Sequence, residues 1–152
     1  MLNTTQTILT AAHCVEDARD VIVTAADHDR VHNDWSEIEI DVERKDIRIH
    51  PHYNDYTFDH DIAILKLPEA LPIDWERDWN VDYACIPEIG QVIEAGTRCW
   101  VAGWGTKSEG GDAPFDMREV NVDMYSDEQC LQKLGAEFFY GSSMVCAGDP
   151  RG

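Results

Sequence analysis

The sequence predicts an all-β protein, on the basis of three features. Apolar and acidic residues alternate strictly through 37–43, which is typical of a strand with one buried face. A nearly continuous apolar run at 62–67 is typical of a strand buried on both sides. The other apolar segments are short and separated by glycine and proline, a pattern that favours a β architecture.

The expected strands follow one another along the whole chain. In order, they cover 21–24, 37–43, 47–49, 62–67, 92–93, 99–102 and 120–124. After 37–43 the alternation resumes at Ile47 and Ile49 with its parity shifted by one residue. This shift predicts a β-bulge near Arg44 and Lys45.

One segment has the pattern of a short helix. Ser126 is followed three residues later by Gln129, which is the spacing of a capping box, and leucines follow. Gly135 stands where such a helix would end. A single turn is also expected over 11–15.

The charge balance excludes some classes of partner. The chain has 12 basic and 30 acidic residues, a net charge of −18, which disfavours nucleic acid and anionic membranes. No apolar run approaches the roughly 20 residues that cross a bilayer. A hydrophobic content of 43%, with five tryptophans, favours a packed core over disorder.

Two motifs suggest acid–base chemistry. His13 stands in Thr10–Cys14 (TAAHC), and Asp61 follows it by 48 positions at the head of Asp61–Leu67 (DIAILKL). A histidine that acts as a general base needs a carboxylate to fix its tautomer and to stabilise the imidazolium. The alternatives to these roles are a structural histidine and a surface acid. The apolar run directly after Asp61 favours it over Asp55 and Asp59 as the partner of His13.

Five segments in a fixed order resemble the landmarks of the trypsin/chymotrypsin-like serine proteases. They are 8–14 (ILTAAHC), 49–51 with 61–65 (IHP and DIAIL), 84–87 (ACIP), 99–105 (CWVAGWG) and 144–148 (MVCAG). The resemblance covers nearly the whole chain. It implies a partial chymotrypsin-like double β-barrel with one short helix.

The resemblance also implies an incomplete domain, truncated at both ends. About 1–80 would be the remainder of the first barrel, and about 81–152 the start of the second. The family is usually secreted, and no signal peptide is visible after Met1, so we expect the full-length form to carry its signal upstream.

The resemblance makes His13 the general base and Asp61 its orienting partner. The family nucleophile lies in a Gly-Asp-Ser-Gly-Gly-like turn, and none of the five serines lies in such a turn: Ser36, Ser108, Ser126, Ser142 and Ser143. By family spacing the nucleophile and the specificity pocket belong after Gly152. We therefore expect the 152-residue chain alone to be inactive.

The five cysteines leave at least one without a partner in the chain. By resemblance, Cys130 and Cys146 form a disulfide beside the substrate cleft. The family partners of Cys14, Cys85 and Cys99 would lie outside these residues.

The serine-protease interpretation requires no cofactor, but a structural calcium ion is one hypothesis. Residues 27–37 resemble the loop that binds calcium in some family members, with Asp27 and Glu37 at the carboxylate positions. An acidic solvated loop is the alternative that we favour. Zinc bound by His28 with His32, or by His50 with His52, is favoured less because these pairs lie in expected loops.

The leading interpretation is a serine endopeptidase with protein or peptide substrates and with protease inhibitors as further partners. The principal alternative is a catalytically inactive homologue that acts as a binding module. The presence of both His13 and Asp61 argues against that alternative, since a binding module has no chemical need for a paired histidine and aspartate. An acidic calcium-binding structural module is a third interpretation, and calcium-dependent thermal stability would identify it.

Overall fold

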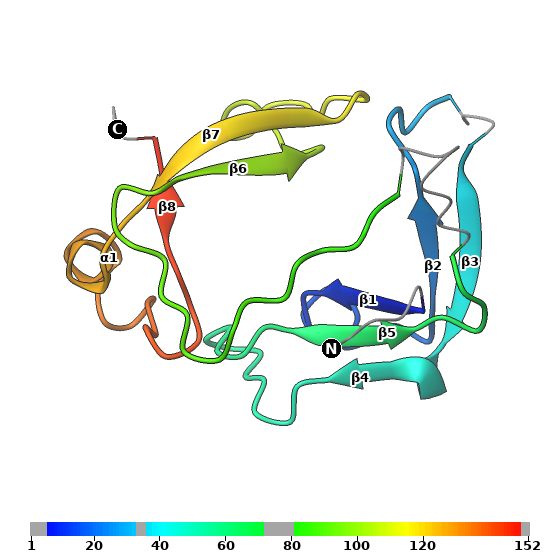
Figure 1. Cartoon of the computed structure of the whole chain (residues 1–152), viewed down its shortest axis with the longest axis horizontal. Helices are drawn as coiled ribbons and strands as arrows, with labels where there is room; N and C mark the ends of the chain where they lie inside the picture. The colour runs from blue at the N-terminus through cyan, green and yellow to red at the C-terminus, as the bar shows by residue number, and fades with distance from the viewer. Residues whose placement is uncertain (1–5, 33–35, 72–80, 150–152) are drawn as a thin grey trace. The chain divides into compact units, whose positions relative to one another are not determined.

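The computed structural model describes residues 6–32, 36–71 and 81–149 (Figure 1). Within these ranges the regular secondary structure is mostly strand, with one α-helix and one short 3-10 turn, in agreement with the all-β prediction. The elements are β1 (Thr7–Thr10), β2 (Asp20–Ala25), β3 (Ile38–Glu43), η1 (Arg44–Asp46), β4 (Ile47–Ile49), β5 (Ala63–Lys66), β6 (Arg98–Gly103), β7 (Arg118–Met124), α1 (Asp127–Leu134) and β8 (Ala147–Gly148).

The chain divides into two compact units. The first comprises 1–27 with 35–88, and the second comprises 28–34 with 89–152. The expected barrel boundary near residue 80 stays a prediction, and residues 72–80 lie outside the described ranges.

The first unit contains two antiparallel arrays of strands. One sheet has the order β1-β5-β4, with Leu9 opposite Ile64 and Ile47 opposite Leu65. The other is the β2–β3 pair, in which Val21 lies opposite Val42. Figure 1 shows β5 between β1 and β4. Since β5 has a hydrogen-bonded neighbour on each side, it is the best fixed strand of its sheet.

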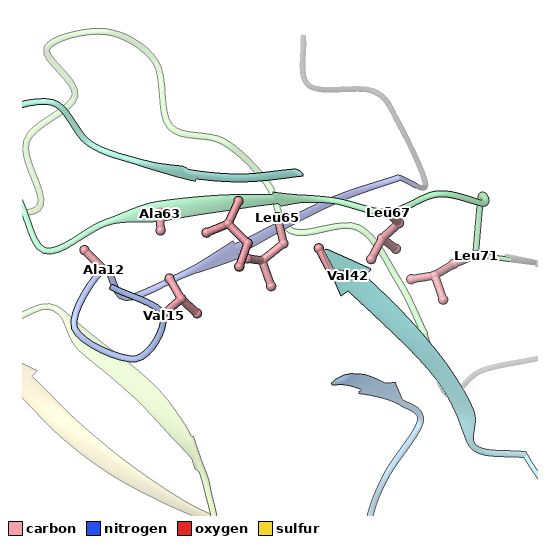
Figure 2. Close-up of a cluster of buried hydrophobic side chains, with 8 residues drawn as sticks. Ala12, Val15, Val42, Ala63, Leu65, Leu67 and Leu71 are labelled. Atoms are coloured by element: carbon pink, nitrogen blue, oxygen red, sulfur yellow. The ribbon is translucent and has the colours of Figure 1, made fainter. Parts of the chain in front are cut away.

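A cluster of apolar side chains forms the core of the first unit (Figure 2). Its buried members are Ala12, Val15, Val42, Ile47, Ala63, Leu65, Leu67 and Leu71. Strands β1 to β5 and the turn after β1 all contribute to this cluster or pack against it. The turn that holds His13 is therefore anchored on both sides of the histidine by buried residues.

The prediction that 62–67 is buried on both sides is wrong in part. Ala63, Leu65 and Leu67 are buried, whereas Ile62 is 40% exposed and Lys66 is exposed. Side chains alternate across a strand, and only one face of β5 packs on the core cluster. The apolar composition of the run alone does not show this difference.

The expected bulge at Arg44 and Lys45 is instead the 3-10 turn η1. The parity of the apolar pattern changes there because the chain leaves one sheet and enters another. Strand β3 before the turn pairs with β2, and β4 after it pairs with β5.

The second unit contains the three-stranded antiparallel sheet β6-β7-β8. Cys99 lies opposite Val122, and Met124 lies opposite Ala147. The strand expected at 92–93 is absent from the described residues, and Val92 is 82% exposed there. A two-residue apolar pair forms a strand only where a neighbouring strand supplies backbone partners.

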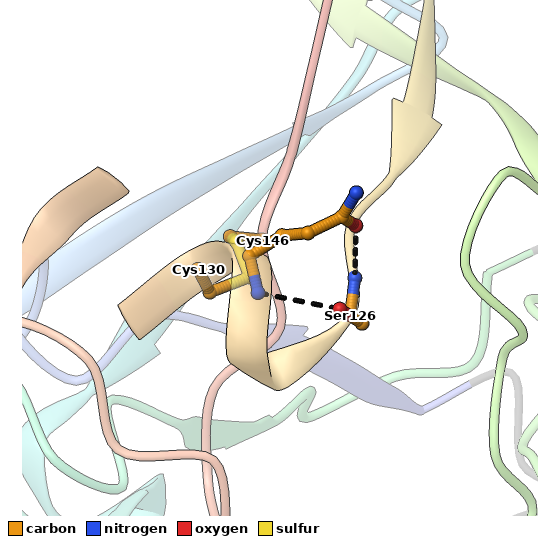
Figure 3. The surroundings of a disulfide bond; sticks show 4 residues. Ser126, Cys130 and Cys146 are labelled. Carbon is orange, nitrogen blue, oxygen red and sulfur yellow. Dashed lines mark hydrogen bonds between the residues drawn. A yellow bond between two sulfur atoms is a disulfide. The ribbon is translucent and has the colours of Figure 1, made fainter. Parts of the chain in front are cut away.

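Helix α1 begins and ends where its sequence pattern predicts. The Ser126 hydroxyl accepts the Gln129 N–H, and the Gln129 side chain accepts the Ser126 N–H, which completes a capping box (Figure 3). Gly135 ends the helix with a φ of 87°, a conformation that favours glycine. Cys130, fully buried, joins α1 to Cys146 by a disulfide.

Among the described residues, no helix is both long enough and apolar enough to pass through a bilayer.

Candidate active site

His13 lies in the tight turn that follows β1. The Val15 N–H donates to the Ala12 carbonyl at 3.0 Å, so the two buried residues that flank the histidine also close its turn. Burial of Ala12 and Val15 fixes the backbone, while the His13 ring remains half-exposed. The sequence prediction of a turn at 11–15 is confirmed.

Arg44, the first residue of η1, holds the His13 turn through two hydrogen bonds. Its guanidinium donates to the Val15 carbonyl at 2.8 Å and to the Ala18 carbonyl at 3.3 Å. These carbonyls belong to a turn and have no strand partner, so a charged donor satisfies them well. The η1 turn that separates two sheets thereby also positions the histidine segment.

Asp61 stands two residues before β5. The His50 N–H donates to the Ile62 carbonyl at 3.0 Å, which fixes the backbone beside the carboxylate. The preceding loop is closed by Asn54, whose side-chain oxygen accepts the N–H groups of Tyr56 and Thr57, each at 3.0 Å. Asp61 therefore lies on a braced loop end next to the central strand.

The structure brings His13 and Asp61 into direct contact. Asp61 Oδ1 accepts the His13 backbone N–H at 2.9 Å, and Asp61 Oδ2 lies 2.6 Å from His13 Nδ1. The side chains are 48% and 21% exposed, respectively. Two hydrogen bonds from one residue to one carboxylate fix both the position and the orientation of the imidazole.

The electrostatic environment keeps Asp61 ionised. Burial raises the pKa of Asp61, but the backbone and ring hydrogen bonds of His13, its charge and a backbone hydrogen bond from Ala12 outweigh burial. The net result is a pKa below the usual value of 3.8. An ionised Asp61 keeps the proton on His13 Nδ1, which leaves Nε2 as the basic nitrogen.

The lowered pKa of Asp61 predicts an acid-sensitive contribution to stability. Its ionised form stabilises the folded chain above the unfolded-state pKa, and this contribution is lost as pH falls through the folded-state pKa. We expect the urea midpoint of the unsubstituted chain to fall more steeply than that of Asp61→Asn as pH drops from about 5 towards 3. Asp55→Asn, at an exposed aspartate of the same loop, should keep the original slope. Equal slopes for Asp61→Asn and the unsubstituted chain would contradict this assignment.

Two further side chains contact the imidazole, and neither was predicted to do so. Phe58 meets the His13 ring edge-to-face, with centroids 5.6 Å apart. The Cys14 sulfur lies 3.4 Å from His13 Nε2. Adjacency in sequence hinted at Cys14, whereas no sequence signal pointed to Phe58, whose backbone has an unusual φ of 57°.

Comparison with known proteins identifies the family. The family model described as "Trypsin" matches residues 1–152. The chain belongs to the trypsin family. It is 34% identical over 149 residues to Trypsin-1 of Astacus astacus, covering 95% of this chain and 59% of that protein. It is 35% identical over 156 residues to Protein masquerade of Drosophila melanogaster, covering 97% of this chain and 14% of that protein.

A solved structure described as "Structure of GrC" superposes with a TM-score of 0.82 at 27% identity. The match covers 96% of this chain and 60% of that one. The trypsin-family chain therefore has the expected all-β, partial chymotrypsin-like double-barrel fold with one short helix. It spans less than two thirds of each of these three proteins.

The cysteines of this trypsin-family chain fall into two groups. Cys130 and Cys146, expected to form a disulfide, are joined, with Cα atoms 6.2 Å apart. Cys14 and Cys85 are exposed free thiols, and Cys99 is a partly buried one.

The calcium hypothesis remains a prediction. Asp27 Oδ1 is buried, and no donor among the described residues reaches it, so this oxygen is available to a cation. Glu37 is half-buried. Residues 33–35 of the same loop lie outside the described ranges.

The histidine pairs considered for zinc have other contacts. His32 Nδ1 lies 2.6 Å from Asp29 Oδ2, and the His28 carbonyl accepts the Met117 N–H at 2.9 Å. His50 Nδ1 accepts the His52 N–H at 3.2 Å. Among described residues, no three histidine, cysteine or acidic side chains gather to hold a metal.

Proposed function

We propose that this chain is the dyad-bearing part of a serine endopeptidase, with His13 as general base and Asp61 as the residue that orients it. The observation that supports this most is the double hydrogen bond from His13 to the Asp61 carboxylate, at 2.9 Å and 2.6 Å. Membership of the trypsin family supports proteins and peptides as the substrates.

The proposed division of labour is that of the family. His13 Nε2 would take the proton of the attacking serine hydroxyl and later return it to the leaving amine. Asp61 would remain ionised and stabilise the imidazolium formed between these steps. Its lowered pKa suits that role, since the carboxylate stays charged across the neutral range.

The nucleophile is expected beyond Gly152. None of the five serines lies in a Gly-Asp-Ser-Gly-Gly-like turn. Ser126 in addition uses its hydroxyl to cap α1. Reading the sequence after Gly152 tests the proposal directly, because a serine in that turn favours the enzyme and a substituted serine favours an inactive binding module.

The 152-residue chain by itself should not hydrolyse peptides. Without the serine and the oxyanion donors of its turn, the dyad has no hydroxyl to activate and no site for the tetrahedral oxyanion. We expect turnover of a chromogenic peptide ester at the buffer rate, with an active trypsin as the positive control. Turnover above buffer that disappears in His13→Ala would contradict this expectation.

Secretion and binding of protease inhibitors are proposed with the activity. A disulfide between Cys130 and Cys146 suits an oxidising compartment. Inhibitors that mimic a bound peptide would compete with the substrate for the same site.

A further inference from the structure

The aspartate of the His13–Asp61 pair lies between two residues that are both held by His50. We propose that the stacked rings of His50 and His60 direct the Asp61 carboxylate towards His13, so that both histidines are positioning residues. The position of the carboxylate can be tested without any hydrolysis. Its effect on catalysis rests on the proposed function and is tested separately.

The backbone around Asp61 has a tight and uncommon conformation. The Ile62 N–H donates to the His60 carbonyl at 2.7 Å, which closes a three-residue turn with Asp61 at its centre. His60 has a φ of 55°, in the left-handed region that residues with a Cβ atom seldom occupy. Such a conformation persists only where surrounding contacts hold it. The contacts of His60 therefore decide where Asp61 points.

His50 holds the residue on each side of Asp61. Its ring stacks on the His60 ring, with centroids 4.6 Å apart and planes inclined by 14°. Its backbone N–H donates to the Ile62 carbonyl at 3.0 Å. One residue therefore fixes position 60 through its side chain and position 62 through its backbone, which leaves Asp61 little freedom to turn.

Both stacked residues are themselves restrained. His50 directly follows β4, its carbonyl accepts the Tyr53 N–H at 3.0 Å, and its Nδ1 accepts the His52 N–H at 3.2 Å. The buried Nδ1 of His60 lies 3.0 Å from Asp59 Oδ1. His50 and His60 are half-buried. The two rings therefore meet in a geometry that the surrounding chain defines.

The pKa of Asp61 reports where its carboxylate points. Burial raises this pKa, but the two hydrogen bonds from His13, at 2.9 Å and 2.6 Å, and the charge of His13 outweigh burial and hold the pKa below 3.8. Each bond uses a different carboxylate oxygen, so a rotation of Asp61 breaks both together. A displaced carboxylate should therefore have a higher pKa.

The test is a titration of the Asp61 carboxylate by carbon NMR in the 152-residue chain. His50→Ala removes the ring but keeps the backbone hydrogen bond to Ile62, and we expect the pKa of Asp61 to rise towards the usual value of 3.8. His50→Phe restores a flat ring and should restore the low pKa. A pKa that His50→Ala leaves unchanged, or that stays high in His50→Phe, would overturn the proposal.

A second variant reaches the same loss from the other ring. His60→Asn removes that ring, and asparagine tolerates a positive φ. Because one stack is lost in either case, the double variant should raise the pKa no more than the larger single effect, whereas additive effects would overturn the proposal. Amide signals of β1 and β5 in the same samples report whether the sheet is intact. Loss of the sheet in both single variants would assign the rings a structural role and would also overturn it.

His52→Ala is the matched control. The His52 ring lies beside the same two rings, with centroids 5.7 Å from that of His50 and 5.8 Å from that of His60. The backbone N–H of residue 52 still donates to His50 Nδ1 after the substitution. The control should leave the pKa of Asp61 unchanged. A rise equal to that in His50→Ala would contradict a specific role of the His50–His60 stack.

The kinetic consequence is measured in a form of the protein that continues past Gly152 and includes the serine turn. His50→Ala should lower kcat by up to about 10²-fold with little change in KM, because a misplaced carboxylate leaves the imidazole poorly oriented. His50→Phe should restore kcat. A raised pKa of Asp61 with an unchanged kcat would support positioning by the rings and contradict the proposed role of Asp61 in catalysis.

Discussion

Replacement of His13 by alanine should lower kcat by about 10⁴- to 10⁶-fold in a form of the protein that continues past Gly152 and includes the serine turn. The Nε2 atom is the proposed acceptor of the serine proton. Alanine supplies no acceptor. Of the two hydrogen bonds between His13 and Asp61, only the one from the backbone N–H of residue 13 would remain. KM should change little, because the imidazole acts on the reacting hydroxyl and does not hold the peptide.

The measurement is steady-state hydrolysis of a chromogenic peptide amide, with active-site titration to count functional molecules. His52→Ala is the matched control, since it removes an exposed imidazole of the same unit. The His52 ring contacts the ring of His60, with centroids 5.8 Å apart, and not the Asp61 carboxylate. The control should keep kcat within a few-fold of the unsubstituted enzyme. Retention of more than about one tenth of kcat in His13→Ala would refute its role as the general base.

Truncation of Leu67 to alanine should destabilise the first unit by about 2–5 kcal/mol. The side chain is 1% exposed and belongs to the apolar cluster built from β1 to β5 (Figure 2). Removal of its three outer carbons loses their transfer free energy and leaves a cavity that the surrounding sheets can fill only in part.

Urea unfolding followed by far-UV circular dichroism measures this loss. Leu9→Ala is the matched control, because Leu9 lies in β1, the strand that pairs with β5 just before Leu67, and is 54% exposed. The control should cost about 1 kcal/mol or less. Equal losses for Leu67→Ala and Leu9→Ala would mean that the cluster around Leu67 is not the core of this unit.

Much of the fold could be predicted because its signals are local. The alternation in 37–43 predicts β3, and the Ser126–Gln129 pair predicts the start of α1. The pairing of His13 with Asp61 was predictable from two motifs in family order, and the structure places these side chains in contact. The catalytic roles of the two residues remain proposals.

The errors concern properties that depend on neighbours distant in sequence. The strand expected at 92–93 is absent among the described residues, and the bulge at Arg44 and Lys45 is a 3-10 turn between two sheets. The second face of β5 is only partly covered by described residues, since Ile62 and Lys66 are exposed and Ile64 is half-buried. In each case the pattern shows which residues are apolar, but which strand or surface they meet is set by packing.

The family, the all-β class and the pairing of His13 with Asp61 follow from residue type and order alone, which is why the sequence was enough to predict them. By contrast, the position of the Cys14 sulfur, 3.4 Å from His13 Nε2, is set only in the folded chain. Neighbours in sequence can direct their side chains in many ways, and the ring is oriented here by a carboxylate 48 residues away. That orientation depends on the folding of β5 beside β1, so no local pattern contains it.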